Sequence, residues 1–124
     1  MLFNDPVTNA LLVATPGQAP VPFTSYLLAD PACLTPSAAP LSTPHSSSFL
    51  DLDGDCMPDL FLTKANGTYE IYNQVQVNGT QLFCLVQTDA FSGALVSFAD
   101  MDRDGMPDMV FFDQGSIFTL YNKR

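Results

Sequence analysis

The feature that most constrains the fold is an internal repeat that gives the chain two similar acidic loops. The stretch SSFLDLDGDCMPDLFLT begins at Ser47, and the stretch VSFADMDRDGMPDMVFF begins at Val96. They align without a gap, so Asp51 corresponds to Asp100 at an offset of 49 residues. Each copy runs from an apolar strand through the acidic loop and Met-Pro-Asp into further strands separated by a glycine turn. A period of this length with about four short strands favours a β-propeller blade over a solenoid coil.

The remaining sequence is also typical of β-structure. Apolar runs are short and bounded by Gly, Asn, Asp and Pro, whereas helical periodicity is weak. Asn66-Gly67 and Gln114-Gly115 each separate two such runs and predict hairpin turns. The predicted strands are Leu11–Ala14, Phe23–Leu28, Ser48–Leu52, Leu60–Lys64, Thr68–Asn73, Gln81–Thr88, Ala94–Ala99, Met109–Asp113 and Ser116–Tyr121. The predicted core residues, expected to pack between blades, are Phe49, Leu60, Leu62, Phe98, Val110 and Phe112.

These elements predict an all-β fold, a partial β-propeller of about two four-stranded blades that forms part of a larger ring. The expected divisions are the end of a preceding blade or edge strands (1–29), a linker rich in Pro and Ser (30–47), a blade (48–92) and a second, incomplete blade (93–124). Two repeats cannot close a ring. Either the chain is a fragment of a longer protein, or neighbouring subunits complete the ring, with the first 30 residues as another source of a strand.

The charge of the chain excludes some classes of partner. Four basic and thirteen acidic residues give a formal net charge of −9. Nucleic acids and anionic membrane surfaces both require a positive patch, so neither is an expected partner. No stretch approaches the roughly 18–20 apolar residues that span a bilayer, so we expect no direct membrane insertion within this segment. The first ten residues lack the features of a signal peptide, which predicts a processed chain or a piece of a longer one.

The acidic loops carry carboxylates at positions 1, 3, 5 and 9 in both copies. Carboxylates this close repel one another unless a cation lies among them. Ca²⁺ fits best because it takes about six to eight oxygen ligands in flexible geometry. Mg²⁺ ranks second because it demands octahedral coordination, and the lack of nearby His or paired Cys disfavours zinc. The expected ligands of two calcium sites are the side chains of Asp51, Asp53, Asp55, Asp59, Asp100, Asp102, Asp104 and Asp108, with the backbone carbonyls of Met57 and Met106 at position 7.

Other interpretations of the loops are weaker. An EF-hand needs an acidic residue at position 12 between flanking helices, but Leu62 and Phe111 occupy that position and the flanks are β-rich. Asp-Gly loops also form turns without metal, yet two copies with the same four acidic positions favour a bound ion. Catalysis is disfavoured because a general acid–base pair needs two carboxyls in different environments and an open pocket. No catalytic residue is therefore predicted.

Position 6 distinguishes the two loops. Gly105 can adopt a left-handed conformation freely, whereas Cys56 does so only at a cost. We therefore expect the first site to be looser, or Cys56 to be strained. Other roles open to Cys56 are a small buried apolar group or half of a disulfide. With Cys33 and Cys84, the three cysteines permit one disulfide and one free thiol, or no disulfide.

Two N-x-[ST] sequons begin at Asn66 and Asn78. In a secreted protein both asparagines would be glycan acceptors on surface turns. The alternative is that Asn-Gly is present only for its turn-forming chemistry.

The repeat resembles the FG-GAP/VCBS-type repeats, the calcium-loop blades of integrin-α-like β-propellers, over roughly residues 43–122. A closer likeness is to the T-cell immunomodulatory protein family, in which Pro-His-Ser precedes a blade strand, an acidic loop and an Asp-Leu-Phe-Leu-Thr strand, as residues 44–46 and 59–63 do here. The resemblance implies a type I membrane or secreted glycoprotein whose propeller ectodomain acts in adhesion or signalling. It also implies that the eight loop aspartates bind calcium. Cys56 departs from the family's usual Gly, and the chain is shorter than the family's full ring.

The sequence therefore predicts a non-enzymatic, calcium-binding propeller segment of an extracellular or membrane-anchored glycoprotein that mediates cell adhesion or protein–protein recognition. Its expected partners are proteins, including other chains or blades that complete the propeller. One alternative is an accessory propeller domain of an enzyme that acts on glycans or lipids. That function requires a pocket with an acid that holds no metal, such as Glu70 or Asp89, beside a polar cleft. Another is a purely architectural subunit of an extracellular assembly.

Overall fold

The computed structural model describes residues 2–4, 11–14, 16–41, 48–90 and 94–122, which form three antiparallel sheets and no α-helix. The predicted all-β, partial-propeller fold is confirmed. The N-terminal sheet has the order β1-β2-β3, the middle sheet β4-β5-β6-β7 and the C-terminal sheet β10-β9-β8. The strands are β1 (Leu2–Asn4), β2 (Leu11–Val13), β3 (Val21–Pro22), β4 (Ser48–Leu50), β5 (Asp59–Thr63), β6 (Thr68–Val77), β7 (Thr80–Ala90), β8 (Ala94–Ala99), β9 (Asp108–Asp113) and β10 (Ser116–Leu120), and a 3₁₀ turn, η1, covers Phe23–Tyr26.

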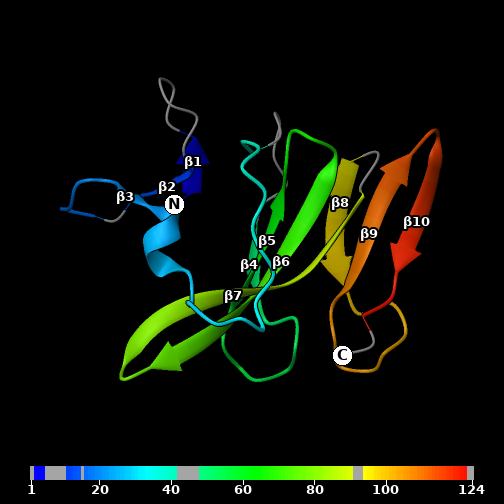
Figure 1. Cartoon of the computed structure of the whole chain (residues 1–124). Coiled ribbons are helices and arrows are strands. Elements are labelled where there is room, and N and C mark those ends of the chain that lie inside the picture. The colour runs from blue at the N-terminus through cyan, green and yellow to red at the C-terminus, as the bar shows by residue number, and fades with distance from the viewer. Residues whose placement is uncertain (1, 5–10, 15, 42–47, 91–93, 123–124) are drawn as a thin grey trace.

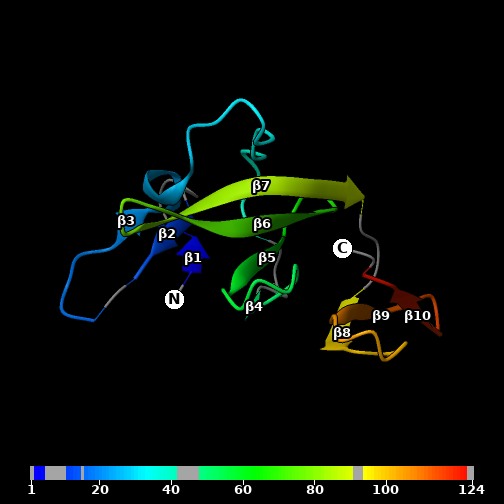
Figure 2. The same ribbon diagram turned by 90° about the horizontal axis from the view of Figure 1, so that it is seen from below.

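The middle sheet lies between the other two (Figures 1 and 2). In Figure 1 the N-terminal sheet and η1 are on its left, and the C-terminal sheet is on its right. A parallel bridge between Leu27 and Phe83 ties the segment after η1 to β7. The middle sheet therefore has a neighbouring sheet on each side, as expected for one layer in a stack of blades.

Strand β5 is the centre of this arrangement, because every one of its residues is buried. Successive side chains of a strand point to opposite faces, so Leu60 and Leu62 join one apolar cluster and Phe61 joins the other. The buried members of the first cluster are Phe23, Leu41, Leu60, Leu62, Tyr72, Phe83 and Leu85, and those of the second are Phe61, Tyr69 and Met109. The rings of Phe61 and Phe98 meet edge to face at 5.2 Å, so the second cluster joins the middle and C-terminal sheets.

One predicted strand is wrong, and two strands, β1 and β3, were not predicted. The chain at Phe23–Leu28 forms η1 rather than a strand, since the Phe23 ring is buried edge-on against Tyr72 at 5.3 Å. Tertiary packing thus outweighs the β-propensity of this segment. Strands β1 and β3 went unpredicted because their three and two residues are too few for an alternating pattern to be visible.

The hairpin turns depend on residues with positive φ. The predicted turns are confirmed: Gly67 has φ +81° between β5 and β6, and Gln114 and Gly115 have φ +50° and +82° between β9 and β10. Asn78 and Gly79 form a further two-residue turn with φ +52° and +81°. Two left-handed residues in succession match the right-handed twist of the strands, which lets β6 and β7 pair along a longer hairpin than was predicted.

Two of the predicted core residues are exposed instead. Phe49 is 54% exposed on the edge strand β4, and Phe112 is 46% exposed on β9. Phe112 pairs with Ile117, which is 68% exposed, so both lie on the face of the C-terminal sheet that no other described sheet covers. Alternation identified β4 and β9 as strands but could not tell which of their faces are covered.

Part of the predicted linker, residues 30–41, forms a strap across the middle sheet. A disulfide joins Cys33 to Cys84 on β7, and the Leu34 N–H donates to the Leu85 carbonyl at 2.8 Å. Cys56 is free and exposed, so its alternatives as a buried group or disulfide half are wrong.

A buried ion pair holds the other end of the strap. Glu70 is 1% exposed and lies 3.4 Å from Lys64 Nζ, while its Oε2 accepts from the Ser37 N–H at 2.8 Å. The Tyr72 hydroxyl donates to Glu70 Oε1 at 2.9 Å, and burial together with the Glu70 carboxylate raises the pKa of Tyr72. The Tyr72 hydroxyl therefore remains a hydrogen-bond donor, and both carboxylate oxygens of Glu70 have partners within the strap and the middle sheet.

The strap generates a stability prediction. In a chain-entropy treatment, a disulfide across a sequence separation of 51 residues contributes about 4 kcal/mol to the free energy of unfolding. Replacing Cys33 and Cys84 together by Ala should lower that free energy by about this amount in urea titrations. Cys56→Ser is the control, with an expected change of less than about 1 kcal/mol. Equal urea midpoints for the native and double-variant proteins would contradict the prediction.

Candidate metal centre

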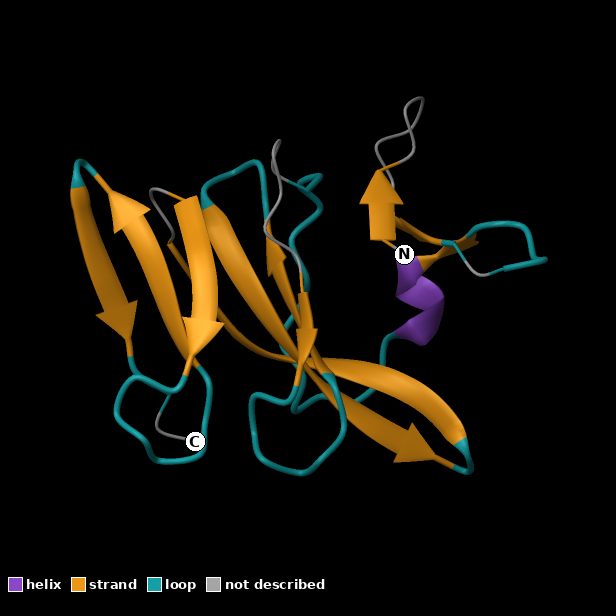
Figure 3. Ribbon diagram, turned by 180° about the vertical axis from the view of Figure 1, so that it is seen from behind, coloured by secondary structure: helices purple, strands orange, loops and turns teal. Residues whose placement is uncertain are grey.

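The two acidic loops lie side by side at the same end of their sheets (Figures 1 and 3). Loop 1, residues 51–59, leads from β4 into β5, and loop 2, residues 100–108, leads from β8 into β9. They approach each other closely, because the Met106 sulfur lies 3.3 Å from the position that a Cβ on Gly54 would take. The repeat therefore brings its two copies together in space.

Both loops gather carboxylates. In loop 1, one oxygen of every predicted carboxylate ligand lies within 4.8 Å of the others: Asp51, Asp53, Asp55 and Asp59. Loop 2 brings together three in the same way: Asp100, Asp102 and Asp108. Asp104 does not join its group, and its Oδ1 accepts from the Met106 N–H at 2.9 Å.

The same side-chain-to-backbone hydrogen bonds shape both loops. At position 1, Asp51 accepts from the N–H of Cys56 at 2.9 Å, and Asp100 accepts from the N–H of Gly105 at 2.8 Å. The carboxylate at position 5 accepts from the N–H at position 7, at 2.9 Å in each loop. Aspartate favours such local bonds with its own turn. The repeat in sequence is therefore a repeat in geometry.

The carboxylate at position 9 anchors each loop to its sheet. Asp59 is completely buried, and its Oδ2 accepts from the Leu52 N–H while its Oδ1 accepts from the Gln74 N–H, both at 2.9 Å. Asp108 is also completely buried. Its Oδ2 accepts from the Met101 N–H at 2.9 Å, and its Oδ1 accepts from the Asn122 N–H at 2.7 Å. Each anchor therefore joins the start of its loop to a residue 14 or 15 positions further along the chain.

Each loop needs left-handed residues at positions 4 and 6. In loop 1 these are Gly54 at φ +81° and Cys56 at φ +65°; in loop 2 they are Arg103 at φ +59° and Gly105 at φ +85°. The predicted strain at Cys56 is confirmed. Loop 2 carries comparable strain at Arg103, which the sequence analysis missed, so each loop combines one glycine with one strained residue.

The carboxylates of loop 1 disturb one another's protonation. Burial and the neighbouring Asp55 and Asp59 raise the pKa of Asp53 to about 6. Burial also opposes the ionisation of Asp51, but the N–H groups of Cys56 and Gly54 outweigh it and lower the pKa of Asp51. Without a cation, Asp53 of loop 1 therefore takes up a proton at mildly acidic pH, below about pH 6.

The donor atoms in both loops suit a hard cation. The gathered side chains offer only carboxylate oxygens, which favour Ca²⁺ or Mg²⁺ over zinc. Both oxygens of Asp51 accept backbone N–H groups, yet a carboxylate has about four lone-pair sites and can still bind an ion. Met57 and Met106, the predicted carbonyl ligands, follow the left-handed residues at position 6 in each loop.

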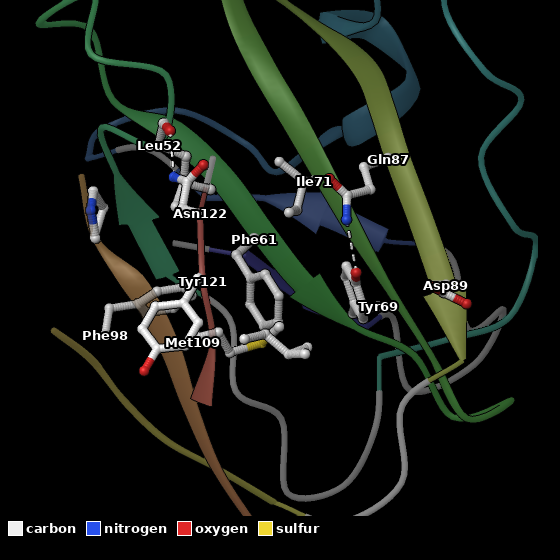
Figure 4. A pocket seen from close by; sticks show the side chains of 12 residues that line it. Leu52, Phe61, Tyr69, Ile71, Gln87, Asp89, Phe98, Met109, Tyr121 and Asn122 are labelled. Carbon is white, nitrogen blue, oxygen red and sulfur yellow. Dashed lines mark hydrogen bonds between the residues drawn. The ribbon is translucent and has the colours of Figure 1, made fainter. Parts of the chain in front are cut away.

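A pocket of about 310 Å³ lies between the middle and C-terminal sheets (Figure 4). Its wall includes the apolar side chains of Phe61 and Met109, the Gln87–Tyr69 hydrogen bond of 2.8 Å, and Asp89. Of the two acids considered for an enzymatic function, only Asp89 lines this pocket. Asp89 is the one carboxylate among the described residues that line this pocket, and it is exposed.

Both sequon asparagines are exposed on hairpin turns. Asn66 accepts from the Thr68 hydroxyl at 2.7 Å and donates to Ser37 of the strap at 3.1 Å. Asn78 lies at the tip of the β6–β7 hairpin. Glycosylation of either residue stays a prediction.

Strain at position 6 generates a paired prediction. Cys56→Gly should raise the free energy of unfolding by about 1 kcal/mol, because glycine tolerates the left-handed conformation. Gly105→Ala should lower it by a similar amount, and no atom lies within 4 Å of the new Cβ, so strain alone is tested. Urea unfolding in EGTA measures both. Changes of the same sign in the two variants would contradict the assigned geometry.

The anchors generate a second prediction. Asp59→Ala should lower the free energy of unfolding by about 3 kcal/mol in EGTA, because buried N–H donors lose their acceptor. Asp55→Ala is the control: this carboxylate is exposed, so its loss should cost less than about 1 kcal/mol. Urea unfolding again provides the measurement. Similar effects of the two substitutions would show that burial of the anchor is unimportant.

Comparison with known proteins identifies the repeat. Residues 51–111 match the family model of the FG-GAP-like repeat, which covers just under half of the chain and includes both acidic loops. No curated protein and no solved structure matches the chain. The chain therefore carries FG-GAP-like repeat sequence across both loops, the kind of repeat from which β-propeller blades are built.

Proposed function

We propose that the chain is a non-enzymatic, calcium-stabilised β-propeller segment that serves cell adhesion or protein–protein recognition outside the cell. The observation that carries this proposal is the duplicated loop, in which equivalent carboxylates are gathered by equivalent backbone hydrogen bonds. A unique active site would not be expected to occur twice in the same form, whereas a structural ion site is expected to recur in each repeat.

Electrostatics supports calcium as the ion. Loop 1 places four carboxylates within 4.8 Å of one another, at the cost of a strongly raised pKa at Asp53. A divalent cation among these carboxylates would compensate their mutual repulsion and favour their ionised forms. Two Ca²⁺ ions would offset part of the net charge of −9. Loop 2 would hold its ion with Asp100, Asp102 and Asp108, and Asp104 would join them by releasing Met106 or through a water molecule.

Three features support an extracellular or membrane-anchored glycoprotein. The Cys33–Cys84 disulfide persists in oxidising compartments. Asn66 and Asn78 are exposed and open to a glycosyltransferase. The finer likeness to the T-cell immunomodulatory protein family points the same way. No helix in the described part of the chain is long and apolar enough to cross a membrane.

Protein recognition fits the surface better than catalysis. Exposed Phe112, Ile117 and Phe118 on the C-terminal sheet offer apolar area of the kind that contacts other proteins or blades. The enzymatic alternative depends on Asp89 alone. FG-GAP-like repeats are typically structural or recognition modules.

Calcium binding is directly testable by melting and titration. Millimolar Ca²⁺ should raise the melting temperature by several degrees relative to EGTA, because the ion binds only the folded loops. The native protein should bind two equivalents, and the Asp53→Asn, Asp55→Asn double variant should bind one. Asp89→Asn is a control that removes a carboxylate outside the loops and should leave both equivalents. Identical melting curves in EGTA and in calcium would overturn the proposal.

A further inference from the structure

The two loops are joined by a continuous chain of hydrogen bonds that passes through Asn122. The Asn122 N–H donates to Asp108 Oδ1 at 2.7 Å, and its side-chain Nδ2 donates to the Leu52 carbonyl at 2.6 Å (Figure 4). The N–H of the same peptide group, which belongs to Asp53, donates to Asp59 Oδ2 at 3.3 Å. The chain therefore runs from the buried anchor of loop 2 to the buried anchor of loop 1.

The link through Leu52 is rigid. The Leu52 carbonyl and the Asp53 N–H belong to one planar peptide group, so they cannot rotate independently. Moving Asn122 must therefore tilt the peptide that bears Asp53, one of the gathered carboxylates of loop 1. Leu52 is 3% exposed, which keeps this peptide away from competing water on its side-chain face.

Gln74 provides an internal comparison. It occupies the place in loop 1 that Asn122 occupies in loop 2, because its N–H donates to the anchor Asp59 at 2.9 Å. Its side-chain Nε2, however, donates to the Pro58 carbonyl at 2.8 Å, within its own loop. Two amide residues thus have the same backbone role, and only Asn122 reaches the neighbouring loop.

We propose that Asn122 couples the two loops, so that an ion in either loop raises the affinity of the other for its ion. This inference rests on the calcium binding proposed above. An ion in loop 2 fixes the Asp108 carboxylate and with it Asn122, which holds the Leu52–Asp53 peptide in the position that loop 1 needs. By linkage, an ion in loop 1 favours the same arrangement from the other side. Asn122 is a positioning residue and contacts no ion.

The test measures the coupling itself by calorimetric calcium titration. Single-loop proteins are made with Asp53→Asn, Asp55→Asn or with Asp100→Asn, Asp102→Asn. The coupling factor is the product of the two association constants of the intact protein divided by the product of the two single-loop constants. We expect a factor of at least about five. When Asn122→Ala is added to the intact and the single-loop proteins, the coupling factor should fall to about one. When Gln74→Ala is added instead, the coupling factor should be retained.

A role that is only structural would have a different signature. It would weaken each loop's affinity but leave the coupling factor unchanged, and that outcome would overturn the inference. So would a factor of one in the native protein, or loss of coupling in Gln74→Ala as well as in Asn122→Ala. Asn122→Leu, which keeps the size and the backbone N–H but removes the side-chain donor, should repeat the result if Asn122→Ala folds poorly.

A metal-free measurement separates failure of the inference from failure of the proposed function. If the native protein binds no calcium, the proposed function is wrong, and amide hydrogen exchange then decides the coupling. Asp108→Asn should speed exchange at the Gly54 and Cys56 amides of loop 1 by several fold in the native background. It should have no effect there once Asn122→Ala is present. Equal effects in both backgrounds, or none in either, would overturn the coupling.

Discussion

The structure depends on the burial of one aspartate in each repeat. Asp59 and Asp108 have no exposed surface, and an ionised carboxylate in such a place is tolerable only when donors surround it. Backbone N–H groups from the loop and from a later part of the chain provide those donors. Because the donors come from both places, burying the carboxylate fixes the loop, the strand that follows it and the return of the chain together.

Once the anchor is fixed, the other carboxylates have little freedom. Short bonds to backbone N–H groups hold position 1 in both loops, and left-handed residues at positions 4 and 6 turn the chain back on itself. Like charges are thereby held together although they repel one another, and the raised pKa of Asp53 expresses that conflict. The packed sheet and the buried anchor thus hold the loop carboxylates close together, whereas in an unfolded chain their repulsion would separate them.

The local pattern predicted much of the fold and the site. Alternation placed Leu60 and Leu62 in buried β-structure, and the spacing of the repeat indicated that the four carboxylates of loop 1 lie close together, as they do. It could not predict the Cys33–Cys84 pair, since three cysteines allow several pairings. It also could not place Gln74 or Asn122 at the anchors, because an amide 14 or 15 residues from an aspartate has no local signature. Such contacts depend on how strands return through space, which only tertiary structure determines.

The differences between the repeats matter as much as their likeness. The shared carboxylate positions give both loops similar internal hydrogen bonds and bring three equivalent carboxylates together in each loop. A contact between loops, by contrast, needs a residue that breaks the repetition. Gln74 and Asn122 differ by one methylene group, and their amides bond to different loops. In a chain of stacked blades, the repeated residues therefore build each unit, while departures such as Asn122 join one unit to the next.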